Sequence, residues 1–201
     1  MGLFDKKFCD VCGEKIGLLG NRKLDDGNLC KNCAAKLSPW FNERRHSTVA
    51  QIKEQLAYRE DNRNAVAAFH TTRTLGREMK VLLDEDNRKF MVTRARDLAE
   101  ANPDVLDYSQ VTGCDLDVQE HRTEEYKQTA DGKRESYAPP RYTFSYDLDI
   151  IIHVNHPYFD TIQFQLNPSS IDINEGQPLI AALAPDPSRN PDYREYETMA
   201  Q

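Results

Sequence analysis

The sequence predicts an α+β protein with a small four-cysteine zinc ribbon, a linker helix, and then an antiparallel β-sheet or barrel with a C-terminal helix. Three observations support this fold class. Four of the five cysteines form two CxxC pairs near the start of the chain, apolar residues recur at helical spacing just after residue 48, and short alternating segments separated by turns begin near residue 70. We therefore expect a zinc-ribbon-like module over 1–46, a connecting helix over 47–64 and an antiparallel β domain over 65–201.

The composition is that of a soluble globular protein. Of 201 residues, 39% are hydrophobic and 29% are charged, which argues against the disordered and fibrous classes. The apolar runs are too short to cross a membrane, and the start MGLFDKKF lacks the apolar core of a signal peptide. Lys6 occupies the position where an N-myristoylation motif requires Ser or Thr. We therefore expect a cytoplasmic protein, in which thiols stay reduced.

The four N-terminal cysteines have the spacing of a tetrahedral metal site. They occur as C-x2-C, a gap of 17 residues and a second C-x2-C, so each pair can present two sulfurs to one metal ion. Four thiolates leave no open coordination position, which favours a structural Zn²⁺ over a catalytic one. A redox CxxC is the alternative, but that motif normally begins a helix in a βαβ unit, a context that is absent here. The predicted zinc ligands are Cys9, Cys12, Cys30 and Cys33.

The segment between the two cysteine pairs predicts a short hairpin. An apolar stretch over Ile16–Gly20 is followed by a polar one over Lys23–Gly27, and Asp26–Gly27 is a turn dipeptide. Gly13 directly follows the first pair, where such a turn often needs a positive φ. Fewer than fifty residues bury too little apolar surface to fold alone, so metal binding is expected to supply on the order of 10 kcal/mol.

Residues 1 to about 50 resemble a bacterial zinc-ribbon-like domain of unknown function, number 4428. The motifs that carry the resemblance are CDVCGEKIG and the block KLDDGNLCKNCAAKLSP. The resemblance implies metal ligation by the four cysteines and implies no known activity.

A connecting helix is predicted after this module. Thr48 is the expected N-cap, with Gln51 three residues on, and an apolar face follows at helical spacing. We expect the helix to end near Asp61–Asn62, with a further helical turn or a strand lead-in over Ala65–Phe69. Trp40–Phe41 are expected to pack against the zinc module or to dock it on the β domain.

The β domain is predicted from alternation and turns. Residues 79–83 and 89–92 flank the turn Asp84–Asn87, and every even position from Tyr142 to Val154 is apolar. The expected partner strand runs from Thr112 through Val118 into a polar arm that Ala130–Lys133 turns back. A further strand contains Ile162, Phe164 and Leu166, a crossover spans Pro178–Pro187, and a terminal helix begins at Pro191. The layout over residues 66–201 resembles the pleckstrin-homology-like domains of bacteria.

No catalytic constellation is found in the β domain. Cys114 lies on the apolar side of its predicted strand and is expected to be a buried small hydrophobe. His153 and His156 have a spacing that suits a helix better than a strand, so a second metal site is not expected. The pairs Asp115/Asp117 and Asp147/Asp149 could sit on neighbouring strands, where solvation is favoured over a weak cation site. Nothing is assigned to His46, His70 and His121.

These observations favour a non-enzymatic, zinc-stabilised adaptor or scaffold that associates with another protein or with itself. Contacts are expected at edge strands and in the aromatic-rich segment 137–164. An enzyme with a site in the β domain is a further hypothesis, although no phosphate-binding or hydrolase motif supports it. No small-molecule ligand is indicated.

The alternative function is nucleic-acid binding by the zinc ribbon. Residues 1–48 contain nine Lys and Arg against six Asp and Glu, within a chain of net charge −7. Four thiolates and one Zn²⁺ would leave this module almost neutral and the rest of the chain acidic, which disfavours both polynucleotides and anionic lipid. The basic residues that this alternative would use are Lys6, Lys7, Lys15, Arg22, Lys23, Lys31, Arg44 and Arg45.

Overall fold

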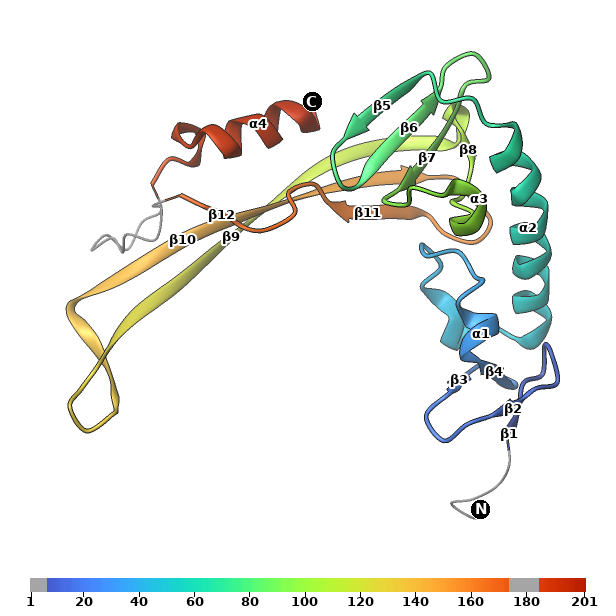
Figure 1. Ribbon diagram of the computed structural model, residues 1–201, viewed down its shortest axis with the longest axis horizontal. Coiled ribbons are helices and arrows are strands. Elements are labelled where there is room, and N and C mark those ends of the chain that lie inside the picture. Colours follow the sequence, from blue (N-terminus) through green and yellow to red (C-terminus); the bar gives the residue numbers. More distant parts are fainter. Residues whose placement is uncertain (1–6, 174–184) are drawn as a thin grey trace. The chain divides into compact units, whose positions relative to one another are not determined.

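A computed structural model describes residues 7–173 and 185–201 (Figure 1). Along the chain, small strands come first, one long helix follows, and antiparallel sheets come after it. The chain divides into two units. The first contains the described residues up to Thr74, together with Val81–Thr112 and Val154–Thr161. The second contains Leu75–Lys80, Gly113–His153 and the described residues from Ile162 onward.

The cysteine module is built from two small hairpins and one helical turn. Strand β1 (Lys7–Phe8) pairs with β2 (Lys15–Ile16), β3 (Asn21–Lys23) pairs with β4 (Asn28–Cys30), and α1 (Lys31–Ala34) follows directly. The predicted turn is confirmed, because the Leu24 amide donates to the Gly27 carbonyl at 2.9 Å. A Cβ on Gly27 would lie 2.6 Å from Val49 Cγ2, so a larger residue there would require the Val49 side chain to move.

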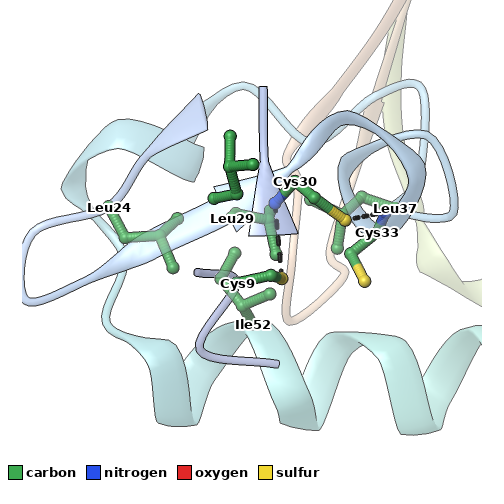
Figure 2. Close-up of a cluster of buried hydrophobic side chains, with 8 residues drawn as sticks. Cys9, Leu24, Leu29, Cys30, Cys33, Leu37 and Ile52 are labelled. Atoms are coloured by element: carbon green, nitrogen blue, oxygen red, sulfur yellow. Dashed lines mark hydrogen bonds between the residues drawn. The ribbon is translucent and has the colours of Figure 1, made fainter. Parts of the chain in front are cut away.

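The core of this module includes a residue of the long helix. Figure 2 shows the buried side chains gathered around the thiols, among them Leu24, Leu29 and Ile52. Ile52 lies on α2 (Val49–Ala68) and is fully buried. Phe41 packs against the same cluster, which confirms that it packs against the cysteine module. The first turns of α2 therefore belong to the core that the cysteines hold.

Helix α2 begins as predicted and ends later than predicted. The Thr48 side chain accepts from the Gln51 amide while the Gln51 side chain accepts from the Thr48 amide, so both halves of the capping box are present. The expected end near Asp61–Asn62 is wrong, because the helix continues to Ala68. Alanine has the highest helix propensity, and the Asn62 side chain is used in tertiary hydrogen bonds.

A buried ion pair within the first unit joins α2 to a distant loop. Arg59 Nη1 lies 2.7 Å from Asp104 Oδ1, with 7% and 0% of the two side chains exposed. Asp104 also accepts from the hydroxyls of Ser38 at 2.8 Å and Tyr58 at 3.1 Å. Arg59 Nε donates to the Lys36 carbonyl at 3.2 Å. The loop after α1, helix α2 and the segment around Asp104 are therefore held by one set of contacts.

Amide side chains complete this network. Asn62 Nδ2 donates to Asn102 Oδ1 and to the Pro103 carbonyl, both at 2.8 Å. Asn62 Oδ1 accepts from the Val105 amide at 3.0 Å. Asn102 has φ 48° and ends α3 (Leu98–Ala101) in the left-handed conformation that asparagine tolerates. The segment Asn102–Asp104 therefore follows the end of α3 and is a buried docking point for α2.

One four-stranded sheet has the order β5-β6-β7-β8. Its strands are β5 (Arg73–Gly76), β6 (Lys80–Asp84), β7 (Lys89–Thr93) and β8 (Leu106–Asp107). The predicted hairpin around Asp84–Asn87 is confirmed as β6 and β7, and the Asp84 carboxylate accepts from the Asn87 amide at 3.1 Å.

The second four-stranded sheet is centred on β10 (Arg134–Val154). Its neighbours are β9 (Val111–Gln128), β11 (Thr161–Gln165) and β12 (Ile171–Asp172). Every even residue of β10 from Phe144 to Val154 is buried, which confirms the predicted alternation. The predicted turn between the arms is also confirmed, since the Thr129 amide donates to the Lys133 carbonyl at 2.9 Å. β9 and β10 form a long two-stranded ribbon (Figure 1).

The predicted barrel is not observed, because neither four-stranded sheet in the described parts of the chain closes on itself. β9 and β10 span 18 and 21 residues, whereas β11 and β12 span five and two. The long strands therefore extend past their neighbours, and β9 is left at the edge of the sheet.

The terminal helix forms where it was predicted. Asn190 caps α4 (Pro191–Ala200), and the buried ring of Tyr193 packs edge-on against Tyr146 with 5.6 Å between centroids. Short 3-10 helices occur at Glu43–His46, Tyr108–Gln110 and Pro187–Arg189. Most of the crossover predicted over residues 178–187 lies outside the described residues.

Replacing Asp104 with Ala should lower the free energy of unfolding by about 3–5 kcal/mol, because the buried Arg59 guanidinium loses its counter-ion. Chemical denaturation monitored by circular dichroism measures this loss. The control is Glu60→Ala, which removes an exposed partner of Arg63 on the same helix and should change stability by less than about 0.5 kcal/mol. Equal effects of the two substitutions would contradict the importance of the buried pair.

Candidate metal centre

The first cysteine pair lies on a tight turn between β1 and β2. The Gly13 amide donates to the Cys9 carbonyl at 2.8 Å, and the Cys9 amide donates to the Glu14 carbonyl at 2.9 Å. Gly13 has φ 75°, which confirms the predicted positive φ and explains why glycine follows the pair. The turn brings Cys9 and Cys12 to the same side of the module.

The second pair lies at the junction of β4 and α1. The Cys30 side chain accepts from the Cys33 amide at 3.3 Å and so caps the helix. The Cys30 amide in turn donates to Cys9 Sγ at 3.3 Å, and Figure 2 shows both contacts. The sulfurs of Cys12 and Cys30 lie 3.8 Å apart. All four Sγ atoms lie within 4.8 Å of one another, so the structure brings the four predicted ligands together.

The pKa values of the Cys9 and Cys33 thiols are shifted in opposite directions. Burial raises the pKa of Cys9, but hydrogen bonds from the amides of Cys12, Cys30 and Val11 outweigh it and hold the pKa at about 6. Burial, followed by contacts with the other three thiols, raises the pKa of Cys33 far above its usual range. Thiolates this close repel one another, so full ionisation of the cluster requires a cation between them.

The geometry suits a closed metal site. Cys9, Cys30 and Cys33 are buried and Cys12 is exposed. Sulfur ligands at mutual distances below 5 Å can surround one ion tetrahedrally, and four of them fill its coordination sphere. Such a site can hold a metal ion and connect distant segments of chain, and it offers no position to a substrate.

Cys114 differs from its prediction. It was expected to be a buried small hydrophobe, but it is exposed on β9. The prediction is wrong because alternation fixes which side of a strand a residue takes and does not require that side to be covered.

The acidic residues of the ribbon do lie on neighbouring strands, where histidine and glutamine side chains contact them. His153 Nε2 lies 2.9 Å from Asp115 Oδ2, and His121 Nε2 lies 3.0 Å from Asp147 Oδ2. Among the described residues the four cysteines form the one cluster that could hold a metal, so the suggested cation site receives no support. Sequence reasoning missed His121, although it shares its parity along β9 with Asp115, and this alternation places the two residues on one face of the strand.

His156 packs among aromatic rings of the first unit. It stacks on Phe159 with 4.1 Å between ring centroids, and Tyr58 lies edge-on at 5.0 Å. Burial lowers the pKa of His156, so the ring tends to remain neutral. These contacts are those of a packed aromatic cluster, whereas His153 lies on β10 and contacts Asp115 of β9.

The described residues therefore define a protein with a module of four clustered cysteines that could hold a metal ion, antiparallel sheets and a terminal helix. A family model described as a domain of unknown function (DUF4428) matches residues 7–55, which include all four cysteines and the start of α2. No curated protein and no solved structure matches the chain. In the parts of the chain that are described, none of the helices has both the length and the apolar character needed to span a membrane.

Removing the metal should unfold the cysteine module together with the first turns of α2, because Ile52 shares the core that the thiols hold. Hydrogen–deuterium exchange before and after chelation should show increased exchange over residues 7–56. Exchange over residues 142–154 of β10 should remain unchanged.

The matched variants are Cys33→Ser and Cys114→Ser, which remove one cluster thiol and one exposed thiol on β9. The first should reproduce the effect of chelation and the second should not. Cooperative loss of protection throughout β10 after chelation would contradict a metal module that unfolds separately.

Proposed function

We propose that this protein is a non-enzymatic, zinc-stabilised adaptor or scaffold that binds other protein chains, including copies of itself. Four thiolates at tetrahedral spacing support Zn²⁺ as a structural ion. Residues 66–201 would act as a pleckstrin-homology-like body, a proposal supported by antiparallel strands followed by α4. The proposed setting is the bacterial cytoplasm.

The observation that carries the proposal is the edge strand β9. It has 18 residues and, among the described strands, pairs only with β10. An edge strand presents unpaired amide and carbonyl groups that can template another strand. A partner strand added along this edge would continue the sheet.

The side chains of β9 also favour association. Four of its apolar residues are 37–49% exposed, namely Val111, Leu116, Val118 and Tyr126. They form half of the eight large hydrophobic residues that are exposed in the described parts of the chain. Covering them with an added strand would remove apolar surface from water, at roughly 25 cal/mol per Å².

Val118→Lys should weaken self-association more than ~10-fold, because a docked strand would force the ammonium out of water at a cost above ~1.4 kcal/mol. Size-exclusion chromatography with light scattering over a range of concentrations measures the change. Leu75→Lys is the matched control, since Leu75 is 39% exposed and lies on β5.

A wild-type chain that remains monomeric at every concentration would contradict self-association. Affinity capture with wild-type and Val118→Lys chains then tests the adaptor. Partners identified by mass spectrometry should be depleted by the substitution, and a partner set unchanged by it would contradict binding along β9.

Nucleic-acid binding is the second candidate, because the structure gathers part of the predicted basic set. Arg22, Lys23, Arg44 and Arg45 line one hollow of the first unit, together with Asn21, Leu24 and Asp25. Burial, followed by the charges of Arg45 and Arg22, lowers the pKa of Arg44. A phosphate placed among these groups would relieve their repulsion. Lys6 lies outside the described residues.

The double variant Arg22→Gln, Arg45→Gln separates this candidate from the adaptor. If the hollow binds phosphates, fluorescence anisotropy with single- and double-stranded oligonucleotides should show binding that weakens with salt. The variant should reduce the slope of log K against log salt by about 0.7–0.9 for each phosphate that is no longer neutralised. Arg63→Gln on α2 is the control, and flat titrations of the wild type at low salt would exclude the candidate.

A further inference from the structure

Two leucines project from the cysteine module with almost no contact to the protein. Leu18 is 95% exposed and Leu19 is 90% exposed, the highest values among the large hydrophobic residues of the described chain. The Gly20 amide donates to the Gly17 carbonyl at 3.0 Å, so the leucines are the two central residues of a closed turn. Central turn positions usually carry Gly, Asn, Asp or Pro. The fold itself gives no reason for leucine at either position.

Basic side chains lie directly behind this tip. Lys15 on β2 and Lys31 on α1 line a shallow hollow together with Leu18 and Leu19. Arg22 Nη1 donates to the Leu19 carbonyl at 3.3 Å. The three cations therefore approach the tip from β2, α1 and β3, and we call them the basic collar.

The charge of the collar is mostly uncompensated by side chains. Within the described residues, no carboxylate lies within 4.0 Å of the collar nitrogens. Glu14 lines the same hollow and is the one acidic residue there. Cys30 also lines the hollow, and as a thiolate it would add negative charge there, but it is buried and its Sγ accepts from the Cys33 amide. Lys15 and Lys31 are exposed. Charges farther than about 8 Å from the tip are largely screened at physiological salt, so the collar and Glu14 dominate the potential at the tip itself.

We propose that this tip binds the surface of an anionic lipid bilayer, with Leu18 and Leu19 entering the boundary between headgroups and acyl chains. The arrangement of an apolar point surrounded by cations matches a bilayer, in which anionic headgroups surround an apolar interior. Each leucine gains free energy on leaving water, and basic residues near an anionic leaflet add electrostatic attraction. A tip of two leucines supports reversible, peripheral binding. This inference goes beyond the proposed adaptor function and does not depend on it.

The test is co-sedimentation of the metal-loaded full-length chain with vesicles. Vesicles of phosphatidylcholine and phosphatidylglycerol in equal parts should retain the protein, and vesicles of phosphatidylcholine alone should retain much less. Binding should fall in about 1 M salt, where the Debye length is ~3 Å. The variant Leu18→Ser, Leu19→Ser should weaken binding more than ~10-fold.

Matched variants distinguish vesicle binding by the tip from binding by other exposed leucines and from loss of folding. Leu75→Ser removes an exposed leucine from β5 and should leave vesicle binding unchanged. Lys15→Gln, Lys31→Gln keeps the leucines and should weaken binding to anionic vesicles. Circular dichroism verifies that each variant is folded.

Three outcomes would overturn the proposal. Anionic vesicles could fail to retain the wild-type chain, as expected if the tip instead enters a pocket of another protein. Retention could be unaffected by the leucine substitutions. Retention could also be equal on neutral and anionic vesicles, which would remove the role of the basic collar. None of these outcomes bears on association along β9, because the tip substitutions leave β9 unchanged and residues 113–128 of that strand belong to the other unit.

Discussion

The first unit depends on the buried carboxylate of Asp104. Its oxygens accept from Ser38, Tyr58 and Arg59, which belong to the loop after α1 and to α2. Removing a carboxylate from water is costly, and a guanidinium with two hydroxyls offsets that cost only in the correct geometry. The pair therefore selects one arrangement of these segments. Ile52, seven residues before Arg59 on α2, contributes to the core around the cysteines, so the helix connects the candidate metal centre with the buried ion pair.

The candidate metal centre could be predicted almost entirely from the sequence, because its information is local. Each CxxC pair lies on one turn, and the spacing of the two pairs alone indicates that four sulfurs can surround one metal ion. The Asp104 network could not be predicted in this way. Arg59 and Asn62 look like ordinary polar residues of an exposed helix, and their partners lie more than forty residues away. Only the tertiary arrangement shows that they are buried.

The β elements show the same limit. Alternation placed the core face of β10 correctly, because that face is covered, as shown by its buried residues from Phe144 to Val154. The same pattern in β9 led to a wrong prediction for Cys114, since that strand is exposed on both faces. The prediction of a closed barrel was wrong for a related reason. Closing a sheet requires the two edge strands to find each other, and a single sequence carries no record of that pairing.

The ribbon formed by β9 and β10 can change in length without disturbing the sheet at its base. The first residues of β10, as far as Thr143, precede the ladder that Ser145 and Tyr146 form with β12. Inserting or deleting matched pairs of residues in both arms would preserve the faces of every remaining side chain, because the period of a strand is two. Each such step would change the reach of the ribbon by ~7 Å and leave its base unaltered. The arms can therefore be lengthened or shortened in discrete increments while the sheet at their base stays the same.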